Sequence, residues 1–219
     1  GALDPSTYGI IGEAYREVEQ KEPWCDDVDS VANIGLLSSA SINMERELDN
    51  ASDTGAGRVL LEEHFLFDVI DREMDFARYK MLILPDDIRI DNPLKAKLDV
   101  YLAQGGKLFL SGESGLMAGK DEFAFDIGAG DAGAGTFKPD YVRPVASLAP
   151  RFVSSPLVMY LPARQIKVTT GQSLGRIYHP YFNRTYKHFC SHQHAPSRTD
   201  PSDYDCGVIN GRILYLAHP

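Results

Sequence analysis

Three almost continuous apolar runs, separated by helix-like segments, constrain the fold of this chain more than any other feature. They are VANIGLLSS (Val31 to Ser39), KMLILPDD (Lys80 to Asp87) and KLFLSG (Lys107 to Gly112). Runs of this kind are typical of strands that are buried on both faces of a parallel sheet. Their alternation with helices predicts a doubly wound, mostly parallel sheet with right-handed crossovers. We therefore expect an α/β fold of three layers with a flavodoxin-like layout.

The chain opens with a helical pattern from Pro5 to Lys21. Its apolar residues recur at three- and four-residue steps, at Tyr8, Ile11, Ala14, Tyr15 and Val18. This spacing predicts an amphipathic helix, for which Ser6 or Asp4 can act as the N-cap.

Two further helices complete the alternation. One is expected from Ala56 to about Leu66, with Thr54 or Asp53 as its N-cap, followed by a short strand FDVID (Phe67 to Asp71). The other is NPLKAKLDVYLAQGG, which has proline in its first turn and glycines after its end.

The character of the sequence changes beyond Gly115. The stretch FAFDIGAGDAGAGTFKPDY is rich in glycine, and VMYLPARQIKVTT alternates as antiparallel strands do. We expect GAGDAGAG to be a flexible loop, because it lacks the G-K-[ST] ending of a phosphate-binding loop. The pair Asn210-Gly211 predicts a two-residue hairpin near the end of the chain. The fold class is thus a mostly parallel sheet with an antiparallel excursion near the C-terminus.

Length and charge limit the classes of function. With 219 residues, 43% of them hydrophobic, the chain can form one sizeable core, and we expect residues 1–219 to be a single domain. A net charge of −9 argues against binding to nucleic acid or to a membrane surface. The sequence has no apolar run long enough to cross a bilayer and does not begin with a signal-peptide pattern, so we expect a soluble polypeptide.

The cysteines and the chain ends carry two smaller inferences. Cys25, Cys190 and Cys206 show no CxxC spacing, so a disulfide framework is not expected, although a single Cys190–Cys206 bond remains open. The leading Gly1, typical of a cleaved tag, and an end directly after RILYLAHP suggest a piece excised from a larger protein.

Several phrases together resemble a known domain family. They are GIIGEAYREVEQKEPW, YKMLILPDDIRID, GGKLFLSGESGL, PYFNRTYKHFCSHQH and YLAHP. They resemble the β-galactosidase trimerisation domain, which has the class I glutamine amidotransferase-like fold and follows the catalytic barrel of certain β-galactosidases and α-L-fucosidase-like glycoside hydrolases. The resemblance implies an accessory domain without cofactor, with the barrel, like subunits in a trimer and a carbohydrate substrate as its partners.

In active members of the amidotransferase fold, a cysteine stands between glycines in a sharp turn after a buried strand, where the strained backbone lifts the thiolate toward N–H donors. Here the turn reads Ser111-Gly112-Glu113-Ser114-Gly115. Glu113 occupies the nucleophile position of the family pattern, and a shift of one residue places Ser114 there. A carboxylate is a poor acyl acceptor, so we expect a degenerate elbow, no catalytic residue and no glutamine hydrolysis.

A hydrolase remains the alternative. A free-standing small hydrolase could use Ser114 or Glu113 with a histidine base from His179, His188, His192 or His194. For attack on acyl esters by Ser114, the Gly-x-Ser-x-Gly spacing is absent, because Leu116 stands two places after it. The structural interpretation is that Ser114 caps a following helix. Glu113 could act as a glycosidase carboxylate only with a second acid, and Asp86 or Asp87 at the end of the neighbouring strand could supply it.

The segment from His179 to His194 concentrates four of the six histidines. Their one-residue spacings with Cys190 do not match structural zinc sites, so no metal is expected. Sugars are bound by residues that stack and hydrogen-bond, and the candidates for lining the substrate entrance are Asn183, Arg184, Tyr186, His188, His192 and His194. The alternative is a surface loop whose histidines bond locally while Tyr181, Phe182 and Tyr186 pack on the sheet edge.

Overall fold

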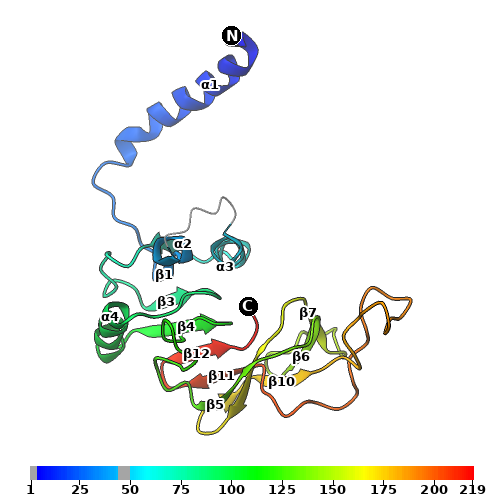
Figure 1. Ribbon diagram of the computed structural model, residues 1–219. Coiled ribbons are helices and arrows are strands. Elements are labelled where there is room, and N and C mark those ends of the chain that lie inside the picture. Colours follow the sequence, from blue (N-terminus) through cyan, green and yellow to red (C-terminus); the bar gives the residue numbers. More distant parts are fainter. Residues whose placement is uncertain (1–3, 44–49) are drawn as a thin grey trace. The chain divides into compact units, whose positions relative to one another are not determined.

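The computed structural model describes residues 4–43 and 50–219 and divides the chain into two compact units, Gly1–Val31 and Ala32–Pro219. The first unit holds helix α1 (Pro5–Lys21) and a short 3-10 helix, η1 (Glu22–Trp24) (Figure 1). Asp4, one of the two expected caps, accepts a hydrogen bond from the backbone amide of Thr7. No side chain of α1 is buried, so its apolar stripe is uncovered within this unit.

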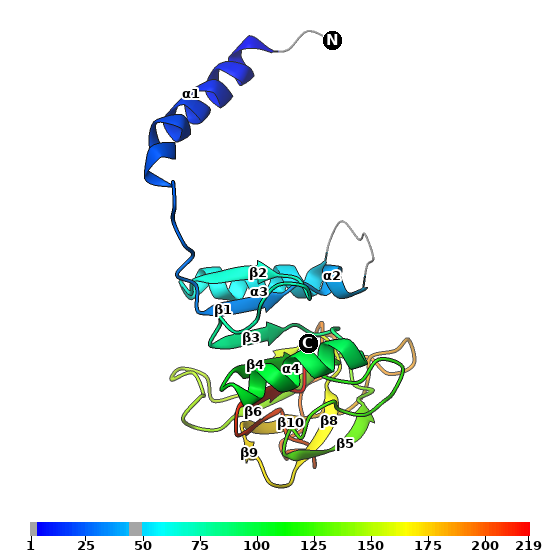
Figure 2. The same ribbon diagram turned by 90° about the vertical axis from the view of Figure 1, so that its left-hand side faces the viewer.

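Five parallel strands belong to the seven-stranded main sheet of the second unit. They are β1 (Ile34–Leu37), β2 (Phe67–Ile70), β3 (Met81–Leu84), β4 (Lys107–Ser111) and β12 (Ile213–Leu216). Their order is β2-β1-β3-β4-β12, which is the strand order of flavodoxin-like folds (Figure 2). The expected α/β fold class with a flavodoxin-like layout is confirmed.

Helices cover the two faces of this sheet. The described part of the second unit contains α2 (Ser39–Asn43), α3 (Ala51–Glu62) and α4 (Asn92–Ala103). Leu36 of β1 clusters with Leu60 of α3. Leu37, the next residue of the same strand, joins the larger cluster that contains Leu94 and Leu98 of α4. Successive side chains of a strand point to opposite faces, so α3 and α4 lie on opposite sides of the sheet, which gives three layers.

The sequence predicts the start of helix α4 correctly but not the start of helix α3. Helix α4 begins as expected, with proline in its first turn and the side chain of Asp91 accepting the backbone amide of Leu94. Helix α3 begins earlier than predicted, and its cap is Asn50, not Thr54 or Asp53. Asp53 lies inside the helix, where its amide donates to the side chain of Asn50, and its carboxylate accepts hydrogen bonds from Ser38 and Ser39 after β1.

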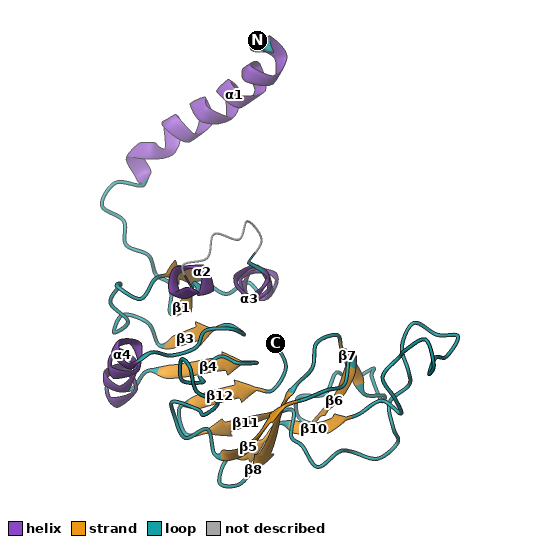
Figure 3. Ribbon diagram, viewed as in Figure 1, coloured by secondary structure: helices purple, strands orange, loops and turns teal. Residues whose placement is uncertain are grey.

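The antiparallel excursion is confirmed and fills much of the C-terminal half (Figure 3). Its strands are β5 (Ala129–Ala134), β6 (Asp140–Pro144), β7 (Leu157–Met159), β8 (Arg164–Val168), β9 (Gln172–Ser173) and β10 (Gly175–Tyr178). The flexible loop expected at GAGDAGAG is wrong, because β5 pairs with β8 along this stretch. A Cβ at Gly135 would lie 2.6 Å from the carbonyl oxygen of Ala163, so only glycine permits this close approach.

The predicted C-terminal hairpin is also confirmed, with its turn one residue later. Strand β11 (Gly207–Asn210) pairs with β12, and Asn210 lies opposite Ile213, which leaves Gly211-Arg212 as the two-residue loop. Gly211 adopts a φ of +57°, which glycine reaches without steric cost. The hairpin returns β12 to the centre of the sheet, between β11 and β4.

Candidate functional site

The carboxyl ends of β1, β2, β3, β4 and β12 lie on one edge of the sheet, where α/β folds bind ligands. The elbow follows β4 on this edge. Gly112 has a φ of +57°, and a Cβ there would lie 3.1 Å from the carbonyl oxygen of Asp86. The backbone amide of Glu113 donates a hydrogen bond of 2.7 Å to that same oxygen. The elbow is therefore locked against the end of β3.

The elbow lacks the context that a nucleophile needs. Over residues 112–128, the chain continues in turns and isolated bridges, and no helix begins there. The expectation that Ser114 caps a following helix is thus wrong. Ser114 is fully buried, and its hydroxyl has no hydrogen-bond partner within the described part of the chain. A substrate cannot reach a hydroxyl in this position.

Glu113 is the exposed member of the elbow, and its carboxylate is already paired. The guanidinium of Arg89 lies 2.9 Å from it, and Arg89 also donates to the carbonyl oxygen of Lys120. No histidine of the described residues forms a hydrogen bond with Glu113 or Ser114. The pairing with Arg89 ties the elbow to the loop after β3.

Asp86 is the most strained acid of this edge. It has a φ of +30°, an uncommon conformation for a residue other than glycine. Its carboxylate accepts a hydrogen bond of 2.6 Å from the hydroxyl of Ser111. Burial raises the pKa of Asp86, and the hydrogen bond from Ser111 opposes this effect only in part. The predicted closeness of Asp86 to the elbow is therefore observed, whereas Asp87 is exposed.

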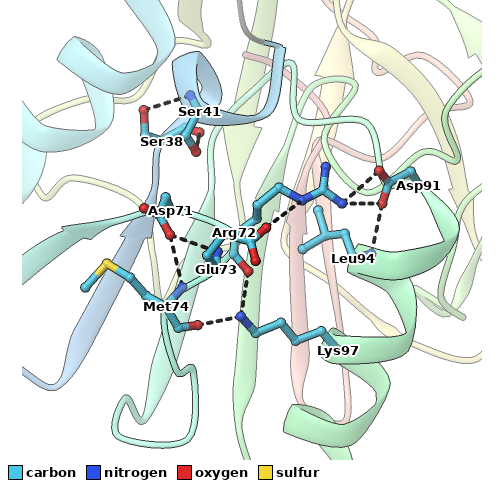
Figure 4. A network of polar contacts seen from close by, with 9 residues as sticks. All are labelled: Ser38, Ser41, Asp71, Arg72, Glu73, Met74, Asp91, Leu94 and Lys97. Carbon is cyan, nitrogen blue, oxygen red and sulfur yellow. Dashed lines mark hydrogen bonds and ion pairs between the residues drawn. The ribbon is translucent and has the colours of Figure 1, made fainter.

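A second polar network fixes the same edge at its outer strands (Figure 4). Arg72, in the loop after β2, donates two hydrogen bonds of 2.8 Å to the carboxylate of Asp91. Lys97 donates to the backbone carbonyl groups of Arg72 and Met74. Partial burial by itself raises the pKa of Asp91, but hydrogen bonds from Arg72 and the Leu94 amide outweigh it and hold this pKa below its ordinary value. The network anchors the loop after β2 to the first turns of α4.

The His-rich segment of residues 179–194 has no helix or strand within its described length beyond single bridges. Asn183 has a clear structural role, because its side chain donates to the carbonyl oxygen of Thr136 and accepts from the amide of Lys138. Arg184 donates to the carbonyl oxygen of Gln193 within the segment. These two candidates hold the segment in shape.

The remaining candidates of this segment differ in exposure. Tyr186 is 86% exposed, His188 and His192 are exposed, and His194 is partly buried beside the ring of Tyr160. The neighbouring Phe189 is 72% exposed. Several aromatic and imidazole rings are thus presented to solvent, so the predicted packing of Tyr186 on the sheet edge is not observed.

A buried cluster that the sequence analysis missed joins the segment to the carboxyl edge. The carboxylate of Asp140 lies 3.1 Å from Nδ1 of His179 and 3.8 Å from Nε2 of His218. Asp140 and His218 are almost fully buried, and the ring of His179 stacks on Phe137. His218 follows β12 at the carboxyl edge of the sheet. Its place just after this strand is the only feature of the sequence that could have marked it as a site residue. His179, a candidate base, is therefore engaged with Asp140.

Metal and thiol chemistry find little support in the described residues. No group of three or more metal-ligating side chains is present among them. All three cysteines are free, so the Cys190–Cys206 bond does not form. Burial raises the pKa of the Cys206 thiol to about 11, which makes it a poor nucleophile. Within the described helices, none is long and apolar enough to cross a membrane.

Comparison with known proteins shows which solved structures this chain resembles. No family profile and no curated protein matches it. Among solved structures, α-L-fucosidase isoenzyme 2 from Paenibacillus thiaminolyticus matches 99% of this chain at 39% identity, with a TM-score of 0.89. The resemblance drawn from the sequence is therefore confirmed. The match covers 33% of the fucosidase chain.

The β-galactosidases show the same fold at lower identity. A catalytic mutant of Gan42B, a GH42 β-galactosidase from G. stearothermophilus, matches all of this chain at 17% identity with a TM-score of 0.69. The β-galactosidase from Bacillus circulans sp. alkalophilus matches 92% of it at 13% identity with a TM-score of 0.58. The chain spans about a third of the length of these glycoside hydrolases. The chain thus matches one part of each of these longer enzymes.

Proposed function

We propose that this chain is a non-catalytic accessory domain of a glycoside hydrolase, which holds subunits together and shapes the substrate entrance of the catalytic barrel. The proposal is supported by the fucosidase match, by the buried Ser114 and by the paired Glu113. Carbohydrate breakdown would then take place on the barrel, with this domain beside it.

The observation that carries the assembly role is an apolar segment along one edge of the sheet. Five large apolar side chains are each more than half exposed within this stretch, namely Val59, Leu61, Phe65, Leu66 and Val69. We call residues 59–69 the edge segment. It runs from the end of α3 into β2, which is the outermost strand of the sheet. Exposed apolar side chains beside an unpaired strand edge are typical of protein interfaces.

The His-rich segment supports the entrance role. Exposed Tyr186, His188 and His192 offer a ring face and polar atoms of the kind that stack on and hydrogen-bond to sugars. Asn183 fixes the base of the segment to residues 136–138. A segment held at its base and exposed along its length fits a wall of an active site that another domain supplies.

Light scattering of the chain tests the assembly role. We expect an oligomer, a trimer by the family resemblance, and a monomer for the double variant Phe65→Ser/Leu66→Ser. The matched control is Val100→Ser, because Val100 is a 56% exposed apolar residue on α4, outside the edge segment. The control should keep the oligomer, and circular dichroism should show all three proteins folded. A monomeric parent chain, or an oligomer that survives the double substitution, contradicts an interface at the edge segment.

A further inference from the structure

An open pocket of about 360 Å³ lies where β6 ends and the connection to β7 folds back. Arg143 and Arg151 both line it, together with Ser155. Its apolar lining comes from Pro144, Ala146, Ala149, Pro150, Val153 and Leu157. Pockets for small ligands have volumes of about 300 to 1,000 Å³ and combine apolar walls with a few polar groups. The pocket therefore has the size and composition of a site for a sugar-sized molecule.

Neither of the two arginines that line the pocket has an acidic partner in the described part of the chain. Within the described residues, no carboxylate forms an ion pair with Arg143 or Arg151. Arg89 and Arg164, by contrast, are each paired with acids. Acids outnumber lysine and arginine by 31 to 22 in this chain, so carboxylates are plentiful. The pocket nevertheless brings together two arginines that have no carboxylate partner among the described residues.

The neighbouring strand increases the positive charge beside the pocket. In the antiparallel pair of β6 and β10, Arg143 lies directly opposite Arg176. Like charges in this position destabilise a sheet. Arg176 is neutralised by the buried carboxylate of Asp205, at 3.2 Å, and donates to the carbonyl oxygen of Ser202. Arg143 has no such partner within the described chain, so its charge is left for an anion that binds beside it.

We propose that this pocket binds the oxyanion of a small ligand, a carboxylate, sulfate or phosphate carried by a sugar-sized molecule. A guanidinium group presents two parallel N–H donors that fit such an oxyanion. The apolar walls would contact the C–H face of a sugar ring. An acidic sugar thus satisfies both parts of the pocket, whereas a neutral sugar leaves the two cations unpaired. Binding here is independent of subunit assembly at the edge segment.

Isothermal titration calorimetry of the full chain tests the proposal with galacturonate, inorganic phosphate and neutral galactose as probes. We expect galacturonate to bind and galactose not to bind. Arg143→Gln and Arg151→Gln should each weaken galacturonate binding by about tenfold or more, the effect of one charge-assisted hydrogen bond. Arg143→Lys should restore part of the loss, because it keeps the charge without the planar fork.

A control variant and competition by phosphate complete the experiment. Arg16→Gln removes an exposed arginine of α1 and should leave binding unchanged. Competition by phosphate would show that the oxyanion alone is recognised, and its absence would show that the acidic sugar is recognised. Arg143 is exposed, so its variants should unfold at the temperature of the parent chain or slightly above it. No binding of any probe, equal binding of galactose, or equal affinity in the double glutamine variant overturns the proposal.

Discussion

The hydroxyl of Ser111 donates a hydrogen bond of 2.6 Å to the carboxylate of Asp86 and so joins the carboxyl ends of β3 and β4. The same Asp86 accepts the amide of Glu113 through its carbonyl oxygen. Asp86 therefore ties the turn after β4 to the end of β3 through both its side chain and its backbone. This relationship makes the elbow rigid and closed.

Asp86→Asn is expected to stabilise the domain at neutral pH by about 0.5–1 kcal/mol, as other single substitutions that remove an unfavourable charge do. Because the pKa of Asp86 is raised in the folded state, folding favours its protonated form. Stability is therefore lost as pH rises from the ordinary aspartate pKa through the raised one. Asparagine also tolerates positive φ better. Urea unfolding at pH 4 and pH 7 measures the effect.

The control for this substitution is Asp87→Asn, which changes the exposed neighbouring acid. It should alter the free energy of unfolding by less than about 0.5 kcal/mol, the usual limit for surface positions. A destabilised Asp86→Asn protein at pH 7 would show that the carboxylate of Asp86 contributes to folding in its charged form.

Asp91 combines an N-cap with an ion pair, and two variants separate these roles. Asp91→Ala should cost about 1 kcal/mol or more, since it removes the cap of α4 as well as the partner of Arg72. Asp91→Asn should cost less, because asparagine keeps the cap. The pKa of Asp91 is lowered in the folded state, so its charged contribution is present above the ordinary aspartate pKa and is lost as pH falls through the lowered one. The parent chain and Asp91→Asn should converge in acid.

Ser114→Ala should leave the free energy of unfolding unchanged or raise it by up to about 1 kcal/mol, because a buried hydroxyl without a partner costs stability. Thermal unfolding of both proteins gives the difference. A loss of more than about 1 kcal/mol would reveal a hydrogen bond of this hydroxyl that stabilises the elbow.

Asn183→Ala should loosen the base of the His-rich segment. The amide of Lys138 loses its acceptor, so its hydrogen exchange should accelerate about tenfold, which corresponds to one ordinary hydrogen bond. Tyr186→Ala is the matched control, because Tyr186 is largely exposed and belongs to the same segment. Unchanged exchange at Lys138 in Asn183→Ala would show that the segment is held by other contacts.

The parallel core could be predicted because its signals are local. Apolar runs such as the one that became β3, and the cap and proline of α4, act over a few neighbouring residues. The start of α3 was missed because Asp53 bonds to Ser38, 15 positions away. Strand β5 was missed because its sequence AGDAGA has neither the branched residues nor the alternation of a strand, and its pairing with β8 decides its conformation.

The polar sites were harder to predict for the same reason. Asp140 lies 39 positions before His179 and further still from His218, and no short motif connects them. The pocket at Arg143 and Arg151 depends on how the loop after β6 folds back, which no periodic pattern encodes. The elbow was easier, because its five residues are consecutive and their chemistry could be read directly, although burial of Ser114 required the fold.

The proposal that the elbow carries no hydrolytic chemistry is tested most directly by the turnover of chromogenic esters and glycosides by this chain. We expect no turnover above the buffer rate in the parent chain, in Ser114→Ala or in Glu113→Gln. Turnover by the parent chain that disappears in either variant would contradict the account and assign a hydrolase active site to the elbow.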